Sequence, residues 1–206
     1  GEILSNDKVP DFKALTDYIH GLGLKFGIYS SPGATTCGGH VGSYQHEEID
    51  ARTWERWGVD YLKYDYCGYL DIEKDSKEET IQEPYIVMRN ALDKVKRDIV
   101  FCVGYGAPNV WNWAAEAGGN QWRTTRDITD EWNVVTAIGT FQDVCTDATA
   151  PGRNNDPDML VVGKLGQGWG SEVHDSYLTA DEQYSHISLW CILSAPLLIG
   201  CDMANM

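Results

Sequence analysis

The sequence predicts an α/β fold made of parallel βα units, closed as a (β/α)8 barrel. Short apolar runs alternate with helical patterns along the chain, which is typical of βα units. An open doubly wound sheet fits that alternation too, but it gathers its site at one switch point, and the chain has no GxGxxG or Walker motif. Chemically competent residues instead follow nearly every predicted strand, as in barrels: Tyr29, Asp65, Tyr105, Arg123 with Asp127, and Asp202.

The predicted strands are short and almost continuously apolar, so each should be buried on both faces of a sheet. They occupy residues 24–29, 59–64, 99–103, 121–125, 159–162 and 196–200, with 121–125 the least apolar. Six strands do not close an eight-stranded barrel. We therefore expect residues 1–206 to form one partial barrel, strands three to eight, which lacks the first two βα units.

Helical patterns lie between these strands, at residues 11–21, 49–57, 84–97, 129–141 and 184–195. The first carries Phe12, Leu15 and Ile19 at helical spacing. Pro84 suits the first turn of the third helix. Thr179 and Glu182 form a capping-box pattern ahead of the last helix.

Charge and cysteine content exclude several classes of partner. The chain has 16 basic and 31 acidic residues, a net charge of -15, so nucleic acid and anionic membrane surfaces are poor partners, whereas a neutral substrate fits. No apolar run approaches the length of a membrane span. The six cysteines form no CxxC pair, which argues against a structural zinc site.

Asp65 is the first candidate site residue. It follows the strand at 59–64 and stands two residues after Lys63, so both side chains point to the same side. We expect Lys63 to hold Asp65 ionised, as a nucleophile requires. A purely structural ion pair explains the same spacing equally well.

Asp127 is the second candidate, placed after residues 121–125 and before the helix at 129–141. An Asp there often only caps a helix. Paired with Asp65, however, it could flank a glycosidic bond, because retaining glycosidases hold two carboxyl groups about 5–5.5 Å apart. Asp127 would then keep its proton until it donates to the leaving oxygen. For the nearby loop with Asp156 and Asp158, a hydrogen-bonding role is favoured over metal binding, because three converging oxygen ligands are not evident.

Ordered motifs from about residue 12 to the end resemble glycoside hydrolase family 27, the α-galactosidase (melibiase-like) family. They are LKFGIY at 24–29, Cys37, IDARTW at 49–54, WGVDYLKYDYC at 57–67, WRTTRDI at 122–128, NDPDML at 155–160 and SAPL at 194–197. The resemblance implies a (β/α)8 barrel followed by a small antiparallel β domain, which we expect this chain to lack.

The resemblance also implies a retaining mechanism without metal or organic cofactor. Asp65 matches the family's nucleophile and Asp127 its acid/base. Lys63 and Arg123 match sugar-hydroxyl contacts, and Tyr29 matches a pocket position.

A disulfide between Cys37 and Cys67 beside the active site is implied in the same way. It predicts a secreted, periplasmic or otherwise oxidising location. Cys37, together with Tyr105 at its strand end, completes the expected substrate-binding set.

The sequence departs from the family pattern at several positions. Tyr66 stands where the family commonly has Asn, and Asn154 where it has Trp. Residues 103–105 after Cys102 replace the usual Glu-Trp or Gln-Tyr. The family's Trp-Asp-Asp motif of strand two, which grips the far sugar hydroxyls, lies outside this chain.

The expected activity is hydrolysis of terminal α-D-galactosides in oligosaccharides or polysaccharides by double displacement, with a carbohydrate as the partner. A β-L-arabinopyranosidase is the close alternative, since its substrate has the same ring pattern without the hydroxymethyl group, and activity on isomaltose-type dextran is a third. A non-catalytic carbohydrate-binding homologue also fits, given the missing strands and the altered pocket residues.

Overall fold

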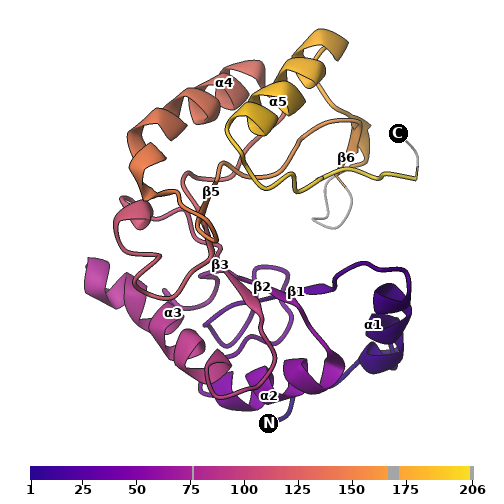
Figure 1. The fold of residues 1–206 in the computed structure, drawn as a ribbon, viewed down its shortest axis with the longest axis vertical. Coiled ribbons are helices and arrows are strands. Elements are labelled where there is room, and N and C mark those ends of the chain that lie inside the picture. The colour runs from indigo at the N-terminus through magenta and orange to yellow at the C-terminus, as the bar shows by residue number, and fades with distance from the viewer. Residues whose placement is uncertain (76, 167–171, 205–206) are drawn as a thin grey trace. The chain divides into compact units, whose positions relative to one another are not determined.

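A computed structural model describes residues 1–75, 77–166 and 172–204 of the chain. It divides into two compact units, the first comprising residues 1–105 and 113–121 and the second residues 106–112 and 122–206. The α/β fold is confirmed: a five-stranded sheet has the order β1-β2-β3-β4-β5, and its first three strands, labelled in Figure 1, pair in parallel. In the part of the chain that the structure describes, none of the helices combines the length and apolar character needed to cross a bilayer.

The first unit contains three four-residue strands, β1 (Gly27–Ser30), β2 (Tyr61–Tyr64) and β3 (Val100–Val103). They pair in parallel and in register, so that Tyr29 lies opposite Lys63 and Lys63 opposite Cys102. Helices α1 (Phe12–Gly21), α2 (Glu47–Trp57) and α3 (Glu78–Leu92) connect them. Its core is aromatic and aliphatic, with Trp54, Leu62, Tyr64, Tyr85, Met88 and Phe101 fully buried.

The helix ends of this unit follow from local chemistry. The Asp11 carboxylate accepts the N–H of Ala14 at 2.9 Å and caps α1. Gly58 ends α2 in the left-handed region at φ 85°, which a residue with a Cβ would adopt only at a cost. The expectation for Pro84 was wrong: α3 begins at Glu78, so Pro84 lies inside the helix, where it is buried.

Asp60 anchors the amino-terminal end of β2. Its carboxylate lies 2.6 Å from His20 Nε2, accepts the N–H of Phe26 at 2.9 Å and pairs with Arg97 at 2.6 Å. Burial by itself would raise the pKa of Asp60, but these donors outweigh it and lower the pKa to about 2. The carboxylate therefore links β2 to α1 and to the segment before β3.

The second unit contains the end of β4 (Gln121–Arg123), the 3-10 helix η1 (Val110–Asn112), α4 (Trp132–Phe141), the 3-10 helix η2 (Gln142–Ala148), β5 (Asn154–Asp156) and α5 (Ala180–Ile192). A short antiparallel pair, β6 (Lys164–Leu165) and β7 (His174–Asp175), was not predicted. The capping box of Thr179 and Glu182 is confirmed at the start of α5. Buried residues of α4, α5 and residues 160–165 form the core of this unit.

Two of the predicted strands are not formed, and a single isolated β-bridge joins the two segments instead. The strand expected at 159–162 meets the one expected at 196–200 only through a parallel bridge between Leu160 and Ile199. The fifth strand of the sheet is instead β5, whose polar sequence, Asn-Asn-Asp, gave no apolar signal. Hydrogen bonds compensate for the burial of this polar strand: Asn155 accepts from Trp122 Nε1 at 2.6 Å and donates to the carbonyl of Cys145 at 2.7 Å.

Candidate functional site

The predicted site residues are divided between the two units, and each half has its own geometry. The second unit contains Arg123 and Asp127. The first unit contains the other six, which are Tyr29, Cys37, Lys63, Asp65, Cys67 and Tyr105. The separation of the Asp65 and Asp127 carboxyl groups stays a prediction.

The strand register places the site residues of β1 and β2 in the first unit on one face of the sheet. Tyr29 and Lys63 are partners across β1 and β2, and Asp65 follows Lys63 by two residues. Side chains two apart on a strand share a face, so all three project to the same side at the carboxyl ends of the strands. The backbone N–H of Asp65 donates to Ser30 O at 2.9 Å and so continues the ladder past β2.

The Asp65 carboxylate is held by two donors. Tyr29 donates its hydroxyl hydrogen to Oδ2 at 2.6 Å, and the backbone N–H of Tyr66 donates to Oδ1 at 2.8 Å. Together the two bonds fix the plane of the carboxylate. Lys63 was expected to act here, but within the described residues no ion pair joins it to Asp65. The hydroxyl of Tyr29, 36 residues away along the chain, is the donor that the sequence did not indicate.

The disulfide between Cys37 and Cys67 is confirmed, with the two Cα atoms 5.2 Å apart. It lies beside the carboxylate, because the Tyr29 hydroxyl is also 3.4 Å from Cys67 Sγ. Ser31 Oγ donates to the Cys67 carbonyl at 2.6 Å. At Gly33 a Cβ would come within 2.4 Å of the same carbonyl, so the close approach of the two loops requires glycine there.

Among the described residues, one cluster has the residue types and spacing that could hold a metal ion. It consists of Cys37, Asp65 and Cys67. The two sulfur atoms are bonded to each other, so neither is available as a thiolate ligand. The cluster is therefore best described as a carboxylate beside a disulfide.

In the second unit, Arg123 is the centre of a buried ion pair. Its Nη2 lies 2.7 Å from Asp158 Oδ2, and the two side chains are only 4% and 3% exposed. Asp158 Oδ2 also accepts the N–H of Ile128 at 2.9 Å, and the Asp158 carbonyl accepts from Trp190 Nε1 at 2.7 Å. These contacts hold Asp158 in the left-handed region at φ 82°, which a non-glycine residue rarely adopts.

Asp127 contacts the same guanidinium from solvent. Its carboxylate lies 3.1 Å from Arg123 Nη2, yet the side chain is 94% exposed. The alternative of a helix cap does not apply, because α4 begins at Trp132 and is preceded by Glu131. Arg123 thus joins a buried carboxylate to an exposed one, and Asp127 is free of the packing that would hold it to a structural role.

The Asp156 loop agrees with the expected hydrogen-bonding role. Asp156 Oδ1 accepts the N–H of Asp158 at 2.8 Å, and the Asp156 carbonyl accepts the N–H of Thr124 at 3.0 Å. The ion pair between Asp158 and Arg123 was not predicted from the sequence. The available signal was the pair of acidic residues around Pro157, together with an arginine in the strand at 121–125.

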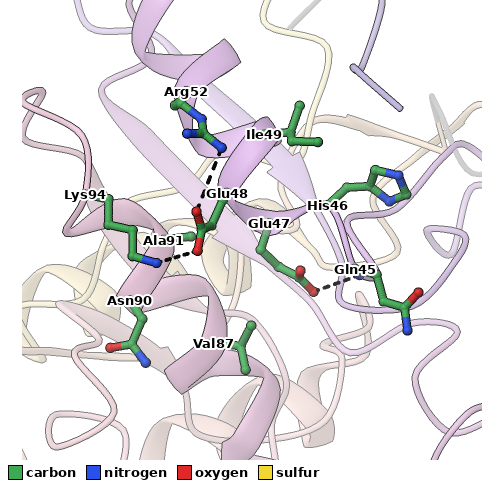
Figure 2. Close-up of a pocket in the computed structure, with 10 residues that line it drawn as sticks. All are labelled: Gln45, His46, Glu47, Glu48, Ile49, Arg52, Val87, Asn90, Ala91 and Lys94. Atoms are coloured by element: carbon green, nitrogen blue, oxygen red, sulfur yellow. Dashed lines mark hydrogen bonds and ion pairs between the residues drawn. The ribbon is translucent and has the colours of Figure 1, made fainter.

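A separate groove in the first unit lies between α2 and α3 and has a volume of about 540 Å³ (Figure 2). Glu48 pairs there with Lys94 and with Arg52. None of the predicted site residues lines it; the lining residues are Gln45, His46, Glu47, Glu48, Ile49, Arg52, Val87, Asn90, Ala91 and Lys94.

Several known proteins are similar to this chain over most of its length. An α-galactosidase from Cyamopsis tetragonoloba is 43% identical over 198 residues, covering 94% of this chain and 43% of the relative. The crystal structure of α-galactosidase I from Mortierella vinacea is 34% identical, with a TM-score of 0.81 over 95% of this chain and 51% of that one.

A β-L-arabinopyranosidase of family GH27 from Geobacillus stearothermophilus is 26% identical, with a TM-score of 0.77 over 95% of this chain and 53% of that one. The chain therefore spans about half the length of the relatives it matches. The family model described as Alpha galactosidase A (Melibiase_2) matches residues 5–206, and the chain belongs to that family.

Proposed function

We propose that the protein is a retaining, exo-acting glycoside hydrolase that removes terminal α-D-galactosyl residues from oligosaccharides or polysaccharides. The observation that carries this proposal is the Asp65 carboxylate, oriented by Tyr29 and the Tyr66 N–H at the carboxyl end of β2. The family supports the substrate class, since its relatives of about 40% identity are α-galactosidases.

In the first step of the proposed reaction, a carboxylate oxygen of Asp65 attacks the anomeric carbon of the galactosyl residue. The bond to the leaving oxygen breaks, and Asp127 gives that oxygen its proton. The hydrogen bonds from Tyr29 to Oδ2 and from the Tyr66 N–H to Oδ1 fix the plane of the carboxylate, and each oxygen keeps a further lone pair for the attack.

In the second step, water attacks the anomeric carbon of the glycosyl-enzyme ester. Asp127 now takes the proton from water, and the bond to Asp65 breaks, so the carboxylate is restored. Arg123 suits this exchange because Asp158 already balances most of its charge, leaving a weak hold on Asp127. In this proposal Arg123 and Lys63 bind sugar hydroxyls, and the substrate also contacts Tyr29, Cys37 and Tyr105.

The architecture and location extend the same proposal. The parallel sheet is part of a (β/α)8 barrel, which these residues form from its third strand onward. The Cys37–Cys67 disulfide fits an oxidising compartment, and we propose that the enzyme is exported. The assays below therefore use the full-length protein.

The roles of the two carboxylates can be tested separately. Asp65→Asn should abolish hydrolysis of 4-nitrophenyl α-D-galactopyranoside. Asp127→Asn should lower kcat/KM for melibiose by about 10²–10⁴ and affect the first step with the nitrophenyl substrate much less, because nitrophenolate leaves without protonation. α-Galactose should be the first anomer seen by NMR. Unchanged hydrolysis by Asp65→Asn, or β-galactose as first product, contradicts the mechanism.

A second candidate is β-L-arabinopyranosidase activity, favoured by the similarity to the Geobacillus enzyme. The two substrates differ only by the hydroxymethyl group, so the ratio of kcat/KM for the two nitrophenyl glycosides separates them. A higher value for the arabinoside makes it the preferred substrate. Sugar binding without hydrolysis of either glycoside makes the protein a carbohydrate-binding homologue.

A further inference from the structure

Three tyrosine rings form a stack beside Asp65 within the first unit. The ring centroids of Tyr66 and Tyr105 are 4.7 Å apart with an interplanar angle of 17°. The Tyr66 ring also stacks on Tyr85, with the ring centroids 6.3 Å apart and an interplanar angle of 20°. Both spacings lie in the range of favourable offset stacking.

Burial falls from one end of the stack to the other. Tyr85 is fully buried, Tyr66 is 3% exposed, and Tyr105 is half-buried. Tyr105 is therefore the ring that can meet a ligand, and Tyr66 is the ring that supports it. Trp113 packs on Tyr85 at 5.8 Å and closes the buried end.

The hydroxyl of Tyr66 does not explain why tyrosine occupies this position. The oxygen is buried and has no hydrogen-bond partner among the described residues. Burial, followed by the nearby tyrosine Tyr69, raises the pKa of Tyr66 to about 12, so the group is neutral. Its contribution comes from the ring.

The stack is also connected to the carboxylate. The backbone N–H of Tyr66 donates to Asp65 Oδ1, and the Tyr85 hydroxyl donates to the Asp65 carbonyl at 3.2 Å. A change in the Tyr66 ring would therefore reach Tyr105 through stacking and Asp65 through the adjoining peptide.

We propose that Tyr66 is a positioning residue that supports the Tyr105 ring as a platform for the pyranose bound at Asp65. This inference rests on the proposed function. An aromatic face packs on the C–H groups of a sugar at low entropic cost, and it attracts the positive charge that develops on the ring in the transition state.

The test is a double-mutant cycle in the full-length protein with 4-nitrophenyl α-D-galactopyranoside. Tyr66→Leu and Tyr105→Leu should each lower kcat/KM by on the order of tenfold. The double variant should lose little more than the worse single variant, because both changes remove one platform. Tyr66→Phe should recover most of what Tyr66→Leu loses. Tyr18→Leu, on the exposed face of α1, is the matched control.

Losses that simply multiply in the double variant overturn the proposal, as does a Tyr66→Phe variant that is no better than Tyr66→Leu. Tyr105→Leu changes a half-buried ring and remains informative if Tyr66→Leu does not fold. If the wild-type protein hydrolyses no glycoside, the proposed function fails, and calorimetric binding of D-galactose then decides the platform. Weaker binding by both Leu variants supports it, and unchanged binding overturns it.

Discussion

Asp50 should make the folded protein less stable as the pH rises. This carboxyl is 2% exposed in the first turns of α2, and burial raises its pKa to about 6 from an ordinary value of 3.8, although the hydroxyl of Ser43 opposes the shift. Between these two values the folded state binds more protons than the unfolded state, so stability falls with increasing pH.

The difference between a pKa of 3.8 and a pKa of about 6 corresponds to about 3 kcal/mol of stability. The stability supplied by the bound proton is complete below pH 4 and is lost as the pH rises through 6. Asp50→Asn removes the titration, so the stability of the variant relative to wild type should increase by about 3 kcal/mol between pH 4 and pH 8.

Urea denaturation at pH 4, 5, 6, 7 and 8 measures this difference. Other titrating groups contribute to both proteins and cancel. Asp17→Asn is the control, because Asp17 is exposed on α1 and its pair with Lys13 should contribute less than about 1 kcal/mol. A difference between Asp50→Asn and wild type that stays constant from pH 4 to pH 8 would refute the reasoning.

Three further predictions concern ionisation and the disulfide. The pKa of Asp60 is lowered to about 2, so Asp60→Asn should lower the free energy of unfolding by about 2 kcal/mol at pH 7. In urea titrations this difference from wild type should disappear as the pH falls from 4 to 2. Burial lowers the pKa of His186 to about 4. The free energy of unfolding of the wild type should therefore decrease by about 3 kcal/mol as the pH falls from 6.5 to 4, and urea titrations of His186→Gln should not show this decrease. Reduction of Cys37–Cys67 should release two thiols and lower kcat/KM by loosening the loop beside Tyr29; an unchanged thiol count contradicts the bridge.

Much of the fold was predictable because local signals agreed with one another. The capping box of Thr179 and Glu182 and the apolar spacing of residues 11–21 each mark a helix that the structure contains. The runs at 24–29, 59–64 and 99–103 contain β1, β2 and β3. These elements have a hydrophobic period and a local stop signal in the same few residues.

The errors occurred where pairing rather than composition determines structure. Residues 159–162 are apolar enough for a strand, but Leu160 bridges only Ile199. Asn155, in contrast, joins the sheet through polar contacts from Trp122 and to Cys145 that no periodicity reveals. A strand exists only with a partner, and the partner is distant in sequence.

The sequence by itself determined the α/β class, the carboxylate that follows β2 and the likeness to the α-galactosidase family. Those features depend on residue type and on spacing over short stretches of chain. Only the tertiary structure decided which groups act on the carboxylates: Tyr29 rather than Lys63 on Asp65, Asp158 on Arg123, and the ring of Tyr66 under Tyr105. Hydrogen bonds and ring stacking require contact within a few ångströms, and the folded chain creates such contacts between residues that the sequence keeps about 35 to 40 positions apart.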